Sequence, residues 1–424
     1  MESAASVRFN KEPFGYLAGF PTGQICLLSD SAERALRQNA TYEHAREHEL
    51  TEFRVEEDFY LRTPVLVWFE LTLKCNLTCP HCYINAGEAR AAEMSTARLH
   101  DLLDEMADAG VWGIAFTGGE PTIHADFANL VAHARHRNLL VGIATNGMFL
   151  TEALLGKLPR DGVIISISLD DLHIGGRNPQ ADFALASRSI LRCKEFGFAT
   201  NIMTNTNRRN IDKLGALMEW ASSHNVSVRS VPFSPLGRGK LHPELANEPA
   251  DVRKAAEFWI REIEFEHRYH EDYGLCIGSI FNYGLTMSYM TRRCSSGRYL
   301  CYICSDGTVY PCTMCAGERI FECGTVATRP FIDVWRDEWE IRRYSWDNFA
   351  PTCKGCVINR PEYYCAARCP AMSHARHKQY FGCGASEFEI LSTVVRTAML
   401  ASTSVHDYSI QTVELGGLSL KRGD

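Results

Sequence analysis

The sequence predicts an α/β protein: a partial (β/α)6 barrel followed by an irregular, cysteine-rich domain. Two observations lead to this prediction. Apolar runs alternate with helical patterns from about residue 65 to residue 264, and beyond about residue 270 cysteines, glycines and prolines replace the regular periodicity. Such an alternation is typical of a parallel sheet covered by helices. The six β–α units are fewer than the eight of a closed barrel, so we expect an open one.

Length and composition are those of a globular protein with more than one domain. The 424 residues are 46% hydrophobic and 22% charged, which allows two or three domains with a sizeable core. We expect four segments. They are an N-terminal appendage at 1–60, the barrel at 61–270, the cysteine-rich domain at 271–390 and a C-terminal tail at 391–424.

Charge and hydropathy exclude some classes of partner. A net charge of −7 argues against non-specific nucleic-acid binding, which requires a basic face. The N-terminus lacks the apolar segment of a signal peptide, and no run approaches the roughly 20 apolar residues of a membrane span. We therefore expect a cytoplasmic protein that binds neither nucleic acid nor membrane.

In the appendage, residues 7–28 alternate and turn at 20–23, as a hairpin would. Ser29 and Ser31 are candidate N-caps for a helix that ends at Leu36, and a second, charged helix is predicted at 42–52. This hairpin and helix resemble part of a PqqD-like domain that binds leader peptides. The alternative is a plain elaboration packed on the barrel.

The barrel begins with residues 65–71, a continuous apolar run as a doubly covered strand requires. Ser95 is the predicted N-cap of the next helix, whose apolar residues have helical spacing, and Gly110 ends it. The later strands are predicted at 112–116, 139–144, 163–167, 199–203 and 227–231. The later helices are predicted at 125–136, 151–158, 183–196, 211–224 and 252–264.

Cysteines carry the strongest signal of chemistry. The chain has 17, and in a reducing compartment clustered thiols more often hold metal than form disulfides. Cys75, Cys79 and Cys82 directly follow the first barrel strand, with three and two residues between them. Structural zinc requires four ligands, whereas three thiolates on a [4Fe–4S] cluster leave one iron open for a substrate or cosubstrate.

The three cysteines, together with the sequence Thr117-Gly-Gly-Glu-Pro121 one β–α unit later, resemble the radical SAM superfamily. The resemblance implies that the open iron binds S-adenosylmethionine (SAM), which is cleaved reductively to a 5′-deoxyadenosyl radical that abstracts a substrate hydrogen. It also implies a flavodoxin- or ferredoxin-type reductant. The residues implied to contact SAM are His81, Gly118, Gly119, Glu120, Pro121, Ser168, Asp170, Arg177 and Asn205. The alternative for the cysteines is a zinc or disulfide cluster on an unrelated α/β domain.

The later cysteines resemble the SPASM extension of this superfamily, which carries two auxiliary [4Fe–4S] clusters and would bring the total to three. By the family pattern, Cys294, Cys312 and Cys369 hold the first auxiliary cluster, with Cys301 as fourth ligand and Cys304 as its rival. The second is held by Cys353, Cys356, Cys365 and Cys383, although eight residues separate Cys356 from Cys365 where the family has five. One or two zinc sites are the alternative.

The resemblance favours modification of a ribosomally synthesised precursor peptide by crosslinking, thioether formation, epimerisation or decarboxylation. The first rival is dehydrogenation or epimerisation of a small molecule, such as a sugar, cyclitol or amino acid, in natural-product biosynthesis. The second is an electron-transfer or iron–sulfur scaffold protein, against which the SAM-site motif argues. Sulfatase maturation is disfavoured, because Thr313 occupies the position at which those enzymes have an aspartate that acts as a base.

Overall fold

The structure is a computed structural model. It describes residues 7–13, 15–20, 25–36, 45, 59–172, 183–259, 261–262, 294–343, 369–378, 392, 412–415 and 418–421. Arg177, Cys353, Cys356, Cys365 and Cys383 lie outside these ranges, as does nearly all of the helix predicted at 42–52.

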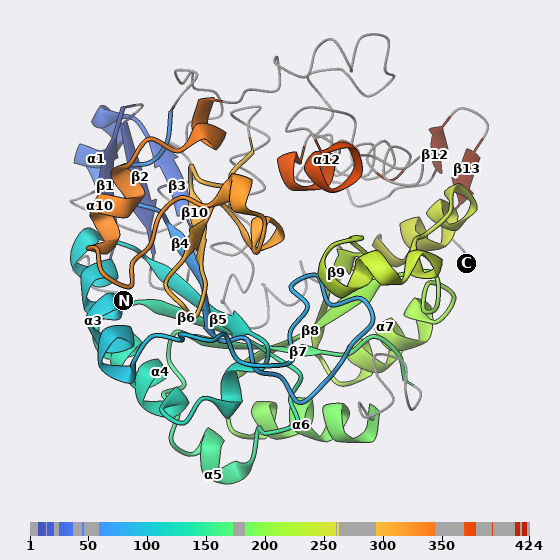
Figure 1. Cartoon of the computed structure of the whole chain (residues 1–424). Coiled ribbons are helices and arrows are strands. Elements are labelled where there is room, and N and C mark those ends of the chain that lie inside the picture. The colour runs from blue at the N-terminus through green and yellow to red at the C-terminus, as the bar shows by residue number, and fades with distance from the viewer. Residues whose placement is uncertain are drawn as a thin grey trace.

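The centre of the described chain is one eight-stranded sheet in the order β11-β10-β4-β5-β6-β7-β8-β9. The strands from β10 to β9 pair in parallel, and β11 pairs antiparallel with β10. In Figure 1 the sheet is curved, and helices α3 to α7 follow its outer side. The predicted open α/β barrel is confirmed.

The predicted barrel elements are present, with ends that shift by a few residues. The strands are β4 (Leu66–Thr72), β5 (Gly113–Gly118), β6 (Leu140–Thr145), β7 (Val163–Ser168), β8 (Ala199–Thr206) and β9 (Ser227–Pro232). The helices are α3 (Thr96–Ala109), α4 (Phe127–His136), α5 (Glu152–Leu155), α6 (Phe183–Glu195), α7 (Leu214–Ser223) and a stretch at 252–259. Short 3-10 helices are η2 (Pro121–Ile123), η3 (Gly237–Leu241), η4 (Pro243–Leu245) and η5 (Pro249–Asp251).

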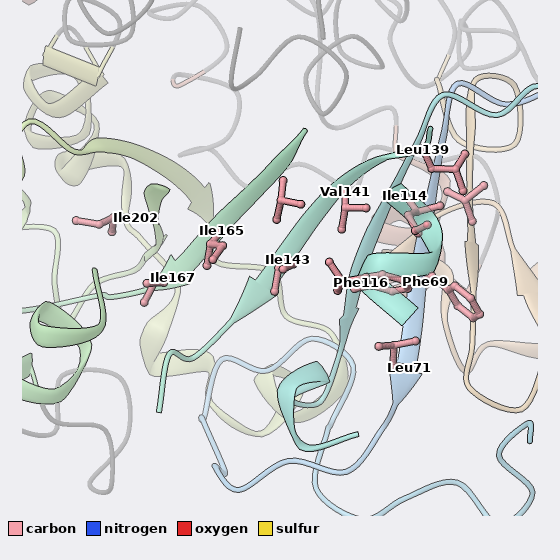
Figure 2. Close-up of a cluster of buried hydrophobic side chains, with 14 of the residues drawn as sticks. Phe69, Leu71, Ile114, Phe116, Leu139, Val141, Ile143, Ile165, Ile167 and Ile202 are labelled. Atoms are coloured by element: carbon pink, nitrogen blue, oxygen red, sulfur yellow. The ribbon is translucent and has the colours of Figure 1, made fainter. Parts of the chain in front are cut away.

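A continuous apolar layer lies between the sheet and its helices. Figure 2 shows Phe69, Phe116, Ile143 and Ile165 on neighbouring strands, all of them buried in this layer. Because side chains alternate along a strand, the opposite face carries the intervening residues. That face is more polar and includes Glu70, Thr117, Ser166, Ser168, Asn201 and Asn205.

The caps predicted for α3 are both observed. Ser95 Oγ accepts a hydrogen bond from the backbone N–H of Arg98, and Gly110 adopts φ +91° at the other end. Gly110 can take this left-handed conformation without the steric cost that a side chain would add. The local signals that begin and end this helix were thus readable from the sequence.

The appendage is a three-stranded antiparallel sheet, one strand more than the predicted hairpin. Its strands are β1 (Arg8–Glu12), β2 (Gly15–Gly19) and β3 (Ile25–Leu28), followed by α1 (Asp30–Leu36). Ser29 Oγ accepts from the N–H of Ala32, as expected of an N-cap. Arg8 donates to Val111 O and Asn138 O, and so attaches β1 to the barrel.

The cysteine-rich region is more regular than predicted. Its strands β10 (Leu300–Ile303) and β11 (Val309–Tyr310) form a hairpin that extends the barrel sheet beyond β4. The helices are η6 (Thr313–Cys315), η7 (Arg319–Phe321), α10 (Phe331–Arg336), η8 (Glu340–Arg343) and α12 (Pro370–His377). Near the C-terminus β12 (Thr412–Leu415) pairs with β13 (Leu418–Lys421). The expected boundary near residue 270 falls outside the described residues, and the parts on either side of it share a sheet.

Candidate active site

The three cysteines of the first cluster lie in the loop that leaves the carboxyl end of β4. The backbone N–H of Leu77 donates to Cys75 Sγ over 3.4 Å, and that of Ala86 donates to Cys82 Sγ over 3.3 Å. Burial raises the pKa of Cys75 to about 11, and charge on Glu120, Cys79 and Cys82 acts in the same direction. A cationic iron cluster would reverse this effect by favouring the thiolates. Three thiols in one loop, two of which accept from backbone N–H groups, match the number of protein ligands that a [4Fe–4S] cluster with an open iron takes.

Gly118 and Gly119 let β5 pass very close to the start of this loop. A Cβ at Gly118 would lie 2.2 Å from Thr72 O, and one at Gly119 would lie 2.2 Å from Lys74 O. The N–H of Gly119 donates to Thr72 O over 2.8 Å, and that of Glu120 donates to Lys74 O over 2.9 Å. The glycine pair therefore fixes the backbone immediately before Cys75.

Glu120 is fully buried and lies among hydrogen-bond donors of the protein. It accepts from Thr145 Oγ1 over 2.7 Å, from the N–H of Asn146 over 2.7 Å and from the N–H of Thr122 over 3.1 Å. Burial raises its pKa, and these hydrogen bonds oppose the rise. Glu120 thus holds the end of β6 against η2, which begins at Pro121. Its contact with SAM stays a prediction.

His81 and Asp170 come from distant segments and meet in the structure. His81 Nε2 lies 3.4 Å from Asp170 Oδ2, and both side chains are buried. The other oxygen of Asp170 accepts from the N–H of Asn205 over 2.7 Å. Three predicted SAM-contacting residues thereby connect the cysteine loop to the ends of β7 and β8. Ser168 ends β7 nearby in sequence, and Arg177 lies outside the described residues.

Sequence reasoning missed two groups that hold the cysteine loop. Asn146 Nδ2 donates to Asn76 Oδ1 over 2.9 Å, which joins the loop to the end of β6. Arg238 of η3 donates from Nη1 to Cys79 O over 2.9 Å and from Nη2 to Ala86 O. Its own N–H donates to Cys82 O over 2.8 Å. The signal available for Arg238 was weak, because it is one arginine in a segment without periodicity.

The predicted ligands of the first auxiliary cluster do not all lie together. Cys294, Cys312 and Cys369 are close enough for charge on one to act on the others. Cys315 lies with them, and its Sγ is 3.7 Å from Cys312 Sγ. Cys301 lies elsewhere, in the main apolar core.

Two contacts connect the cysteine-rich region with the cysteine loop of the barrel. The hydroxyl group of Thr313, between Cys312 and Cys315, is hydrogen-bonded to Tyr83, which directly follows Cys82. Burial raises the pKa of Tyr83 to about 12. Lys240 of η3 pairs with Glu318 over 2.9 Å, close to η7. The two cysteine-bearing regions are therefore neighbours in space.

Two further observations concern the described residues as a set. None of their helices has the length and apolar character that a bilayer crossing requires. No group of three or more of their His, Cys, Asp and Glu side chains is arranged around a single metal ion.

Comparison with known protein families agrees with this geometry. The model of the radical SAM superfamily matches residues 69–221. The model of SPASM, an iron–sulfur cluster-binding domain, matches residues 294–357. The first match covers β4 to α7 and includes the three-cysteine loop and the glycine pair, and the second begins at Cys294.

Similar proteins of known name are enzymes. The mycofactocin maturase MftC of Mycolicibacterium smegmatis is 27% identical, over 70% of this chain and 76% of its own. The AdoMet-dependent heme synthase of Methanosarcina barkeri is 28% identical, over 66% and 84%. Among solved structures, SuiB of Streptococcus suis bound to S-adenosylmethionine has a TM-score of 0.59 at 15% identity, over 78% of this chain and 87% of SuiB. This last likeness shows the fold.

Proposed function

The chain is an enzyme of the radical SAM superfamily with a SPASM iron–sulfur cluster-binding domain, and we propose that it modifies a ribosomally synthesised precursor peptide. The observation that carries the proposal is the similarity to mycofactocin maturases, which extends over 70% of the chain. SuiB, which has the same fold, has been solved in complex with the precursor peptide SuiA. That complex supports a precursor peptide as the substrate class.

The two domains imply iron–sulfur clusters and SAM as cofactors. We propose three [4Fe–4S] clusters, one of them at Cys75, Cys79 and Cys82, and a flavodoxin- or ferredoxin-type electron donor. A [4Fe–4S] cluster with an open iron supplies one-electron reduction of SAM to a 5′-deoxyadenosyl radical.

The chain's own residues would then position SAM and keep out water. His81, paired with Asp170, holds the cysteine loop against the ends of β7 and β8, where Ser168 also lies. The glycine pair keeps the end of β5 close to the cysteine loop. Backbone carbonyl groups there can accept hydrogen bonds from the amino group of the methionine part of SAM. Burial of Glu120 and Asp170 keeps this side of the site dry, which protects a reactive radical from side reactions.

Mass spectrometry tests the proposal. The anaerobically reconstituted enzyme is incubated with SAM, dithionite and short peptides encoded beside its gene. We expect one peptide to lose two hydrogens, to lose CO2, or to keep its mass while a residue is epimerised. The variant with Cys75, Cys79 and Cys82 all replaced by alanine should form no 5′-deoxyadenosine and leave the peptide unchanged. Product from that variant would contradict the site.

A small-molecule substrate is the second candidate, because heme synthases and an Fe-coproporphyrin III synthase have similar identity to the chain. Fe-coproporphyrin III therefore belongs in the same assay as a probe. If it is converted and no peptide is, the peptide proposal is wrong while the radical SAM assignment stands. If a peptide is modified and the porphyrin is recovered intact, the porphyrin alternative is excluded.

A further inference from the structure

Four buried or half-buried thiols from three segments gather beside the barrel. Cys312 and Cys315 stand at the two ends of η6, Cys369 at the start of α12, and Cys294 before β10; we refer to these four as the thiol group. Cys315 lies in one buried cluster with Cys312 and Cys369 packed against it. The N–H of Gly297 donates to Pro311 O over 3.1 Å, which brings the segment of Cys294 beside Cys312. Figure 1 shows α12 near the orange segment that follows β10, and α12 packs on η6.

The turn itself explains why Cys312 and Cys315 lie together. Cys312 is the N-cap of η6 and Cys315 is its last residue, so they stand three positions apart on a 3-10 turn. Side chains three apart on such a turn eclipse one another. Their Sγ atoms are 3.7 Å apart, and Cys315 is 1% exposed. The C-x2-C spacing thus presents two thiols on one side of the turn.

Cys301, the ligand expected from the family pattern, faces away from the thiol group. Its side chain is fully buried in the apolar layer with Ile303 and Val309, and the charged groups that act on it are Cys323 and Arg342. Its strand neighbour Tyr302 packs with Cys312 and Cys315 instead. Since side chains alternate across a strand, Cys301 points to the opposite face.

Cys304, the expected rival, packs in the same buried cluster as Cys315, but its Sγ is engaged by residues outside the thiol group. Arg90 Nη2 donates to Cys304 Sγ over 3.2 Å. The same guanidinium group forms an ion pair with Glu70, whose carboxylate is fully buried. Cys304 therefore belongs to a structural network at the junction between the barrel and the auxiliary domain.

We propose that Cys315 is the fourth ligand of the auxiliary cluster held by Cys294, Cys312 and Cys369, and that Cys301 and Cys304 are not ligands. A fully ligated [4Fe–4S] cluster takes four thiolates, which is the number in the thiol group. The inference rests on the part of the proposed function that assigns an auxiliary cluster to the SPASM domain. It is independent of whether the substrate is a peptide.

Iron analysis in a simplified background tests the proposal. In the full-length chain with Cys75, Cys79 and Cys82 replaced by alanine, only auxiliary clusters should contribute iron, about 8 Fe per chain if there are two. Into this background we place Cys315→Ala and Cys315→Ser, with Cys301→Ala and Cys304→Ala as matched controls. The serine variant keeps the side-chain volume, so a loss common to both Cys315 variants reflects ligation and not a packing defect.

We expect both Cys315 variants to lose up to half of the iron of the background protein, or to keep it with a changed electron paramagnetic resonance spectrum of the reduced cluster. The controls should match the background protein in iron, sulfide and spectrum. An unchanged spectrum and iron content for Cys315→Ala would overturn the assignment, as would the expected loss appearing in Cys301→Ala or Cys304→Ala. If the background protein itself holds no iron, the auxiliary-cluster part of the proposed function fails, independently of the choice of ligand.

Discussion

At the scale of single residues, two glycines differ in the room that the surrounding atoms leave for a side chain. A Cβ at Gly119 would lie 2.2 Å from Lys74 O and 2.5 Å from Leu73 O, and neither backbone atom can move without displacing the cysteine loop. A Cβ at Gly215, on α7, would meet nothing within 4 Å. The two positions therefore differ in steric freedom and in their distance from the site.

We predict opposite effects of alanine at these two positions. Gly119→Ala should destabilise the protein by about 1–3 kcal/mol through overpacking, and it should lower SAM binding and iron retention. Gly215→Ala should be neutral or stabilising by about 0.5–1 kcal/mol, because alanine is the better helix former. Urea unfolding and iron content check both variants. Wild-type iron and SAM affinity in Gly119→Ala would show that the loop tolerates displacement.

The sequence was informative about residues where spacing alone defines chemistry. The three cysteines and the glycine pair could be found because their separations along the chain are short and fixed. The pairing of His81 with Asp170 could not be derived in this way, since it joins segments that only the sheet brings together. The face of β10 on which Cys301 lies could not be derived either, because a family pattern specifies positions along the chain and not the faces of a strand.

At the scale of elements, the segment after β9 closes over the cysteine loop. Gly237 has φ +50°, and a Cβ there would lie 2.4 Å from Tyr83 O, so a glycine is needed for the approach. The next residue, Arg238, donates to two carbonyl groups of the loop with its side chain and to a third with its backbone. A planar guanidinium can serve two acceptors in a way that an ammonium cannot.

We predict that Arg238→Ala weakens retention of the SAM-binding cluster. Hydrogen bonds from a charged donor contribute about 1.5–3 kcal/mol, so iron release to a chelator should become about 10- to 100-fold faster. Arg238→Lys should restore the rate only in part. Arg209→Ala is the control, because Arg209 forms an exposed ion pair with Glu244, and such pairs contribute little to stability. Equal release rates for the alanine variants at 238 and 209 would refute the positioning role.

The hairpin of β10 and β11 is one of the elements that sequence reading missed. Its strands are short, and one pairs with β4, which lies more than 200 residues earlier in the chain. Asp306-Gly307 between two apolar runs is a recognised hairpin signal, and Gly307 indeed adopts φ +86°. This local signal could have predicted the turn, but the pairing with β4 depends on tertiary contacts that no local pattern contains.

At the scale of the whole molecule, one buried network connects the barrel with the cysteine-rich region. Glu70 on β4 is fully buried and accepts from Arg90 and, across the junction, from Tyr302 Oη over 2.6 Å and Ser305 Oγ over 2.8 Å. Because β10 pairs with β4 beside this network, the sheet and the buried charge hold the same two parts together. The two cysteine-bearing regions on either side of the junction therefore share one continuous scaffold.

We predict that removing both partners of this network costs less than the sum of removing each partner alone. Glu70→Ala leaves the Arg90 guanidinium without its buried counter-charge and should lower the free energy of unfolding by about 3–5 kcal/mol. The double variant Glu70→Ala/Arg90→Ala should be less destabilised than the sum of the two single variants, because it removes the uncompensated charge. Urea unfolding of the metal-free chain measures all three, with Glu219→Ala, which breaks an exposed ion pair with Arg261, as the control. Strictly additive effects would mean that the charges are not coupled, and a Glu70→Ala effect no larger than that of Glu219→Ala would mean that the network does not hold the junction.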